Sequence, residues 1–327
     1  MMVGIISQSN DPYFNLASEE YLLKKFNEDV FLLYRNTPAI VVGKHQNTLA
    51  EINFEYVRSN RLTVARRISG GGTVYHDLGN LNFAFITAGE EGSLVDYPRH
   101  TLPIIRAMGL MGLEVTLGTR NELLLGKKKI SGTASHVFKK RVMHHGTLLF
   151  SSALEELQAA LKVVPSSFTD RAVKSVPSRV TNIRDHLGTP MGLEEFSSRI
   201  FQYVLQHTPG ARSYRYSHRD LEEIHRLRNE KYATWDWNFG YSPRYQLTRE
   251  LIFEQGRITV HLNVEKGVIR QLRILGDFQG SDEIGLLEER LTGAIHDPET
   301  LRSRLEGWSV DRFIGGLENE ALVGALF

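Results

Sequence analysis

The sequence has no cysteine among its 327 residues. That absence excludes disulfide bonds, thiolate zinc sites, cysteine-ligated iron–sulfur clusters and a cysteine nucleophile. Any acyl transfer by this chain would therefore use a non-thiol intermediate or pass directly between substrates.

Long apolar runs are also missing. The longest clean stretches are about as short as residues 30–34 and 39–42, whereas a membrane-spanning helix needs roughly 20 apolar residues. The start of the chain has no basic segment followed by a long apolar one, so no signal peptide is expected. These features predict a cytoplasmic protein without a membrane partner.

No charge of one sign dominates the composition. Lys and Arg number 39 against 38 Asp and Glu, which leaves a net charge of +1. Such a balance produces no global field that would attract nucleic acid or an anionic membrane. The 41% of hydrophobic and 24% of charged residues are ordinary for a globular protein.

Strand-like and helix-like patterns are mixed along the first part of the chain. Asp11 suits a helix N-cap and Pro12 suits the first helical position. The remaining patterns predict strands over 30–35, 39–43, 62–66 and 81–87, and helices over 97–113 and 152–161. Because they follow no regular βαβ repeat, they favour an α+β fold over a doubly wound sheet.

The pattern changes near residue 245. Three strands are expected over 247–253, 257–264 and 268–275, joined by short glycine-containing turns. Helices are expected over 281–295 and 298–306 and from Leu317 onward. The aromatic stretch 234–240 precedes this unit. The sequence thus predicts a domain over 1–244 and a small α+β domain over 245–327.

The densest chemical signal is Arg66-Arg-Ile-Ser-Gly-Gly-Gly-Thr-Val-Tyr-His-Asp77. Three successive glycines after a strand allow close backbone approach and offer unobstructed N–H groups to an anion. Two arginines beside them suit phosphate or carboxylate oxygens. A plain glycine-rich turn with solvated arginines explains the same residues equally well. The spacing matches neither a P-loop nor a dinucleotide-binding fingerprint.

Two further segments carry ionisable groups. Lys127 and Lys128 are most simply solvated charges, whereas Lys129 leads into Ile-Ser-Gly132, where a strand can direct it inward. The adjacent histidines His144 and His145 point to opposite faces of a strand, so they do not easily share one metal ion. A packing role for either histidine remains the plain alternative.

These segments closely resemble the signature segments of the lipoate–protein ligase A family. The likeness includes residues 66–77, Lys129-Ile-Ser-Gly-Thr-Ala134 and His144-His-Gly-Thr-Leu-Leu149. It extends, in the same order, to the segments 11–17, 118–122, 178–183, 235–240 and 264–267. Practically the whole chain is covered, as in full-length members that carry a C-terminal domain.

The resemblance implies a two-step reaction. ATP and lipoate, with Mg²⁺ on the triphosphate, give lipoyl-adenylate, and the lipoyl group then passes to a lysine of an acceptor domain. The acceptors implied are lipoyl domains of 2-oxoacid dehydrogenase acyltransferase subunits or the glycine-cleavage H-type carrier protein. The implied fold is a mixed β-sheet flanked by helices, shared with biotin ligases, followed by a small C-terminal domain.

Site residues are implied motif by motif. Lys129 would be catalytic, bridging the acyl carboxyl group and the α-phosphate. No metal ligand is identified. The nucleotide and lipoyl-adenylate would contact residues in the matching segments, namely Arg67, Ser69, Gly70, Gly71, Gly72, Thr73, Val74, Tyr75, His76, Asp77, Asn121, Lys129, Gly132 and His145.

Three alternatives compete with this interpretation. A lipoyl or octanoyl transferase that uses a preformed adenylate or an acyl-carrier donor would keep the same loop and lysine. A biotin ligase fits less well, because the Arg-Arg-Ile-Ser-Gly-Gly-Gly segment is of the lipoate type. A non-catalytic lipoate-binding or regulatory protein would need a lost catalytic group, whereas Lys129 and the loop are intact.

Overall fold

A computed structural model describes residues 1–89, 94–161 and 168–327. Contacts within the chain form two compact units, each of which is treated by itself. The first contains residues 1–44, most of the chain from Val57 to Leu161, and residues 175–234. The second contains residues 45–56, a stretch that ends at Lys174, and the C-terminal part from Trp235 to Phe327.

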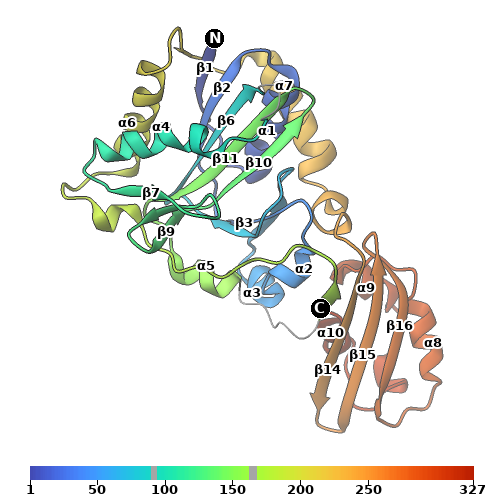
Figure 1. The fold of residues 1–327 in the computed structure, drawn as a ribbon. Helices are drawn as coiled ribbons and strands as arrows, with labels where there is room; N and C mark the ends of the chain where they lie inside the picture. The colour runs from blue at the N-terminus through green and yellow to red at the C-terminus, as the bar shows by residue number, and fades with distance from the viewer. Residues whose placement is uncertain (90–93, 162–167) are drawn as a thin grey trace. The chain divides into compact units, whose positions relative to one another are not determined.

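A six-stranded mixed sheet forms the centre of the first unit (Figure 1), with the strand order β10-β11-β6-β2-β1-β13. Its strands, in that order, are Thr133–Phe138, Arg141–Leu149, Asn80–Ala88, Asp29–Tyr34, Met2–Ile6 and Arg212–Ser213. β1 is parallel to β2 and β13, whereas the pairs β2–β6, β6–β11 and β11–β10 are antiparallel.

Two three-stranded sheets complete the strands of this unit. One has the order β4-β3-β5, made of Thr63–Arg66, Ala39–Val42 and Val74–His76. The other has the order β7-β8-β9, made of Val115–Leu117, Leu123–Leu125 and Lys128–Ser131. The first carries the glycine-rich segment between β4 and β5, and the second carries Lys129.

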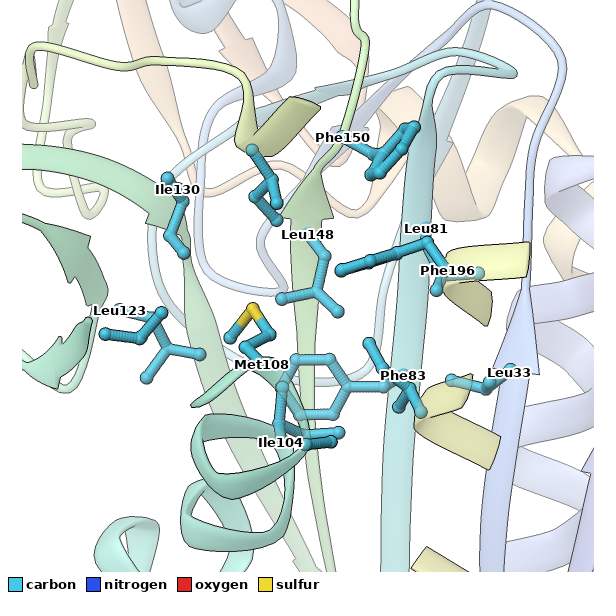
Figure 2. Packing of buried hydrophobic residues seen from close by; sticks show 14 of the residues in the cluster. Leu33, Leu81, Phe83, Ile104, Met108, Leu123, Ile130, Leu148, Phe150 and Phe196 are labelled. Carbon is cyan, nitrogen blue, oxygen red and sulfur yellow. The ribbon is translucent and has the colours of Figure 1, made fainter. Parts of the chain in front are cut away.

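Helices lie on both faces of the six-stranded sheet (Figure 1). α4 (Tyr97–Gly109) and α6 (Leu193–Gln206) contact each other on one face, while α1 (Pro12–Lys25) contacts β6 and β11 on the other and packs against α7 (His218–Leu227). Figure 2 shows Ile104 and Met108 of α4 among Phe83 and Leu148 of the strands. Burial of this apolar surface is the main stabilising contribution of the first unit.

The N-terminal helix α1 begins as the sequence predicts. Pro12 is its first residue, and the carboxylate of Asp11 accepts the backbone N–H of Tyr13. The helix is unusual in being buried nearly all round, including the side chains of Glu19 and Glu20. A polar residue in such a helix needs a partner inside the protein, because water does not reach it.

The second unit contains a four-stranded antiparallel sheet with the order β12-β14-β15-β16. Its strands are Phe168–Asp170, Tyr245–Phe253, Gly256–Glu265 and Val268–Asp277. The helices that follow are α8 (Ile284–Leu291), α9 (Pro298–Arg304) and α10 (Asn319–Ala325). The α+β class and the C-terminal meander predicted from the sequence are confirmed.

Segments distant in sequence join this second unit. In α2 (Thr48–Glu51), the hydroxyl of Thr48 donates to the carbonyl of Asn238 at 2.6 Å. In α3 (Phe54–Ser59), the ring of Phe54 stacks on that of Phe327 at 4.5 Å. A boundary between residues 244 and 245 stays a prediction, because the compact unit also draws on these earlier segments.

The other described helices connect these elements. α5 spans Leu154–Ala160, and short 3₁₀ or π-helical turns lie at Ile183–His186, Arg228–Tyr232, Asp236–Gly240 and Val310–Arg312. In the part of the chain that the structure describes, no helix has the length and apolar character required to traverse a bilayer.

Candidate functional site

The glycine-rich loop, residues 69–73, leaves β4 and enters β5 of the small sheet. Gly71 adopts a φ of +91°, a conformation that favours glycine. Among the described residues, no acceptor binds the backbone N–H groups of Gly70, Gly71 and Gly72. Successive unpaired amides in a turn form a concave anion-binding surface. Binding of an anion by this loop stays a prediction.

Arg67 holds this loop from within. Its Nη2 donates to the carbonyls of Gly70 and Gly72 at 2.6 and 2.7 Å, and its Nε donates to the hydroxyl of Ser69 at 3.0 Å. Nη1 donates to the carbonyl of Val41 in β3 at 3.1 Å. Burial lowers the pKa of Arg67 to about 10. With most of its N–H groups bonded, the guanidinium shapes the loop, and its contact with a nucleotide stays a prediction.

The preceding arginine has a different environment. Arg66 is fully buried, and its Nη1 donates to the carbonyls of Gly43 and Lys44 at 3.0 and 3.1 Å. The backbone N–H of Lys44 donates in turn to the carbonyl of Ser69 at 2.9 Å. Arg66 thus stabilises the segment after β3, beside the glycine-rich loop.

His145 reaches the loop from β11, on the face that α1 covers. Its Nε2 lies 2.6 Å from the hydroxyl oxygen of Ser69, and its Nδ1 lies 2.9 and 3.0 Å from the carboxylate oxygens of Glu19. Glu19 also accepts the hydroxyl of Tyr34 at 3.0 Å. All four side chains are buried. The structure therefore joins α1, β2, β11 and the glycine-rich loop in one polar network.

His144 points the other way, as the alternation of a strand requires. Its ring stacks on His100 of α4 at 4.0 Å, and its Nε2 accepts the backbone N–H of Asp96 at 2.9 Å. Burial and the nearby His100 lower the pKa of His144 to about 4. The two adjacent histidines consequently belong to different networks.

Lys129 lies in β9 and is partly buried, unlike the exposed Lys127 and Lys128. Its backbone N–H donates to the carbonyl of Arg179 at 2.8 Å, and its carbonyl accepts the N–H of Thr181 at 3.1 Å. These two bonds fix the strand that presents the ammonium group. Residues 179–181 therefore lie alongside β9 at Lys129.

Burial lowers the pKa of the Lys129 ammonium group, against the opposing effect of the Glu122 carboxylate. The positive charges of Arg120 and Arg67 lower that pKa further. Positive charge gathered around a partly buried lysine favours an anionic ligand.

Gly132 leaves room for this lysine. An added Cβ at Gly132 would lie 3.2 Å from the Nζ of Lys129. Its backbone is fixed by Thr147 of β11, whose hydroxyl accepts the N–H of Gly132 at 3.1 Å and whose N–H donates to its carbonyl, also at 3.1 Å. Thus β11 positions both His145 and the turn beside Lys129.

The remaining residues predicted for the site have varied surroundings. The backbone N–H of Thr73 donates to the hydroxyl of Ser175 at 2.8 Å. Val74 is half-buried and Tyr75 is buried, opposite Val41 and Ile40 of β3. Asn121 lies in the loop between β7 and β8 with a φ of +62°. A ligand role for Val74, Tyr75 and Asn121 stays a prediction.

His76 and Asp77 have internal partners. His76 Nδ1 lies 2.9 Å from the side-chain amide of Asn36, and burial lowers its pKa to about 3. The carboxylate of Asp77 accepts the backbone N–H groups of Gly79 and Ala153 at 2.9 and 2.7 Å. Its carboxylate thereby connects the turn before β6 to the start of α5.

Sequence reasoning missed Glu19 and Ser175. Glu19 has Leu16, Leu22 and Leu23 three or four positions away on α1, but a glutamate in a helix is ordinarily solvent-exposed, and only the burial of both helix faces reveals its role. Ser175 belongs to a polar stretch without helical or strand periodicity. Its hydroxyl caps Thr73 from 102 residues away in the sequence, a contact that local patterns do not encode.

A protein-held metal site is not found in the described part of the chain. Within residues 1–89, 94–161 and 168–327, no three His, Asp or Glu side chains converge as metal ligands.

Two family models together span most of the chain. Residues 11–205 match the lipoyl protein ligase A/B catalytic domain, and residues 242–326 match the C-terminus of bacterial lipoate protein ligases. These matches coincide with the segments that carry the glycine-rich loop, Lys129 and His145, and with the C-terminal sheet.

Curated relatives align over nearly the full length. The chain is 41% identical over 322 residues to lipoate–protein ligase 1 of Staphylococcus aureus, covering 97% of this chain and 98% of that protein. It is 38% identical over 322 residues to the lipoate–protein ligase LplJ of Bacillus subtilis, covering 97% of each.

Solved structures share the fold. A lipoate–protein ligase A with bound ATP has a TM-score of 0.62 at 24% identity, covering 73% of this chain and 98% of that one. A Thermoplasma acidophilum protein described as a lipoate protein ligase, with bound lipoic acid, also has a TM-score of 0.62, at 22% identity, covering 73% of this chain and 98% of that one. The family models and the curated relatives confirm the resemblance found in the sequence: the chain belongs to the lipoate–protein ligase family.

Proposed function

We propose that the protein activates lipoate with ATP and then transfers the lipoyl group to a lysine of an acceptor domain. The observation that carries the proposal is the combination of Lys129, Arg67 and three unpaired loop amides in one unit. In the first step, a lipoate carboxylate oxygen bonds to the α-phosphorus of ATP. The bond from that phosphorus to the β-phosphate bridge breaks, and pyrophosphate leaves.

This first step brings two anions together, so its barrier includes their electrostatic repulsion. The Lys129 ammonium group would lie between the carboxylate and the α-phosphate and neutralise charge that develops on both. The N–H groups of Gly70, Gly71 and Gly72 would bind phosphate oxygens. Because Arg67 already fixes the carbonyls of this loop, the amides need little reorganisation when the ligand arrives.

In the second step, the uncharged amine of the acceptor lysine attacks the carbonyl carbon of lipoyl-adenylate. A C–N bond forms, the C–O bond to AMP breaks, and the amine loses a proton to solvent. Lys129 would again stabilise negative charge, now on the carbonyl oxygen and the departing phosphate. The mixed anhydride replaces a thioester as the acyl donor, which suits a chain without cysteine.

ATP and lipoate are therefore substrates in this proposal. Mg²⁺ prefers octahedral oxygen coordination and is commonly bound through substrate phosphates. Neither step above is assigned to it. The proposed acceptors are the lipoyl domains of 2-oxoacid dehydrogenase acyltransferase subunits and the glycine-cleavage H-type carrier protein. A solved structure of similar fold pairs a Thermoplasma acidophilum ligase with its E2 lipoyl domain.

Lipoate-dependent exchange between ATP and labelled pyrophosphate tests activation. We expect exchange with lipoate and none when lipoate is omitted or replaced by biotin. Incubation with each purified acceptor, followed by mass spectrometry, then tests transfer and ranks the two acceptor classes. A protein that transfers from supplied lipoyl-adenylate but catalyses no exchange would instead be a transferase without ATP activation.

A further inference from the structure

The side chains of Glu19, His145, Ser69 and Arg67 form a continuous buried chain of hydrogen bonds. The consecutive contacts are 2.9 Å from Glu19 to His145 Nδ1, 2.6 Å from His145 Nε2 to Ser69, and 3.0 Å from Ser69 to Arg67 Nε. Exposed fractions are 0% for Glu19 and Ser69, 6% for Arg67 and 7% for His145. The chain ends at the arginine that binds two carbonyls of the glycine-rich loop.

Hydrogen-bond chemistry gives this chain a direction. Arg67 Nε–H only donates, so the Ser69 oxygen accepts from it and its own hydrogen is free to bond elsewhere. The Glu19 carboxylate only accepts, so His145 Nδ1 carries the proton that faces it. His145 Nε2 can then accept the Ser69 hydroxyl. In this assignment every group in the chain has a partner, as buried polar networks require.

The chain also separates two opposite charges. Arg67 is a buried cation, and the coulombic interaction with Glu19 raises the Arg67 pKa against the lowering caused by burial. Glu19 is further held by the Tyr34 hydroxyl at 3.0 Å. A buried arginine without a counter-charge would be costly, and Glu19 supplies that counter-charge at the other end of the hydrogen-bond chain.

We propose that Glu19 and His145 are positioning residues, which act through Ser69 to hold Arg67 and thereby preform the glycine-rich loop for phosphate binding. This inference rests on the proposed function, because it names how that site is organised. The arrangement of carboxylate, imidazole and hydroxyl is also that of a nucleophilic serine. The burial of the Ser69 side chain and its bond from Arg67 favour positioning over nucleophilic attack.

A double-mutant cycle of Ser69→Ala and His145→Ala tests the connection. Each single variant should lower kcat/KM for lipoate-dependent pyrophosphate exchange about tenfold, the equivalent of one buried hydrogen bond. Most of the loss should lie in KM for ATP. Because both side chains act through Arg67, the double variant should be no worse than either single variant. Independent, multiplying losses would overturn the proposal.

His145→Gln provides a rescue that a general packing role would not. A glutamine amide can reach the position of imidazole Nε2 and accept the Ser69 hydroxyl, so most of the activity lost in His145→Ala should return. The matched control is His144→Gln, on the same strand but in the His100 network, which should leave the KM for ATP unchanged. Equal changes in the KM for ATP at His144 and His145 would contradict the proposed hydrogen-bond chain.

The Arg67 Nε–H itself gives a readout that does not depend on activity. In the wild-type protein its proton resonance should be displaced and protected from exchange with solvent, and Ser69→Ala or His145→Ala should remove both properties. This resonance can be measured even if the wild type shows no pyrophosphate exchange. The measurement therefore distinguishes an error in the proposed hydrogen-bond chain from an error in the proposed function. A lipoyl mass adduct on Ser69 during turnover would establish a nucleophile and overturn the positioning role.

Discussion

Gly132 lies so close to Lys129 that a side chain at position 132 would take up the space of the lysine side chain. An added Cβ would lie 3.2 Å from Lys129 Nζ and 3.4 Å from Cε, and it would meet no other heavy atom within 4 Å. The space that glycine leaves at this turn is therefore occupied by the ammonium group of the proposed catalytic lysine.

We predict that Gly132→Ala lowers kcat for adenylate formation about tenfold or more while the melting temperature changes little. The backbone at Gly132 does not adopt a positive φ, so alanine fits, and the flexible end of Lys129 must move instead. Displacement of a charged group by a fraction of an ångström is costly in a preorganised site. Pyrophosphate exchange and a thermal melt provide the measurements.

Gly188→Ala is the matched control for that variant. Gly188 has no heavy atom within 4 Å of an added Cβ and no positive φ. The Gly188→Ala variant should therefore have the activity of the wild type. If Gly132→Ala were equally active, the position of the Lys129 ammonium group would not matter for the first step.

A second prediction concerns the three successive lysines. Lys129→Ala should lower the rates of adenylate formation and of transfer by about 10²–10³, the usual effect of removing one preorganised charge. Lys127→Ala and Lys128→Ala should retain nearly full activity, because both side chains are exposed. Lys129→Arg should rescue only in part, since a planar guanidinium does not replace a compact ammonium group.

Ligation from lipoate and ATP measures both steps, and ligation from synthetic lipoyl-adenylate isolates the second. Near-normal transfer by Lys129→Ala in the second assay would restrict its role to activation. Burial also lowers the Lys129 pKa below its ordinary value of 10.5. The alkaline loss of activity, caused by deprotonation of this group, should accordingly begin at a lower pH than an exposed lysine would give.

A third prediction separates the glycines of the loop. Gly70 has open space around an added Cβ, so Gly70→Ala should fold normally and report on ligand approach alone. Gly71→Ala should cost about 1–2 kcal/mol of stability, because its φ of +91° disfavours a side chain. At Gly72 an added Cβ would lie 3.3 Å from the Ser175 backbone, so Gly72→Val should displace that segment.

Titration with a non-hydrolysable lipoyl-adenylate analogue, together with chemical unfolding, distinguishes these three variants. Weaker binding by Gly70→Ala at unchanged stability supports close approach of the ligand to the loop. Unchanged binding by Gly70→Ala would support a structural turn. Variants at Gly71 and Gly72 alone do not answer this question, because the first also lowers stability and the second also displaces the Ser175 segment.

Much of the fold was predictable because its signals are local. The cap at Asp11, the glycine turns of the C-terminal meander and the glycine-rich loop each depend on a few neighbouring residues. Strand β1 was not predicted, and the two-residue β13 has too few residues to carry a pattern. The extent of the second unit depends on contacts such as Thr48 with Asn238, which no local pattern contains.

The candidate site residues came from the same kind of local signal, and their roles stay predictions. Motifs identified Arg67, Lys129 and His145, because a family resemblance marks residues whatever their contacts. The partners of these residues were harder to find. Glu19 reaches His145 across 126 positions in the sequence, so no local pattern pairs the two residues. A buried network is a property of the tertiary structure, so hydrogen-bond connectivity cannot be derived from residue types alone.

The last prediction concerns His296 in the second unit. Its Nδ1 accepts the Tyr245 hydroxyl at 2.6 Å, its Nε2 donates to the carbonyl of Leu326, and its ring stacks on Phe327 at 4.5 Å. Burial lowers the His296 pKa from 6.5 to about 4. The unfolded chain therefore binds a proton more readily than the native protein between these two pH values.

Stability should consequently fall as the pH decreases from 6.5 towards about 4, and the His296 contribution to that loss should be about 3 kcal/mol. Above pH 6.5 this histidine is neutral in both states and contributes no pH dependence. His296→Gln keeps a donor and an acceptor but does not titrate, so its unfolding free energy should depend less steeply on pH over this range. His144 and His76, whose pKa values burial also lowers, retain their contributions in both proteins. Denaturant unfolding at several pH values measures the difference, and equal slopes for the wild type and His296→Gln would show that His296 is not protonated on unfolding.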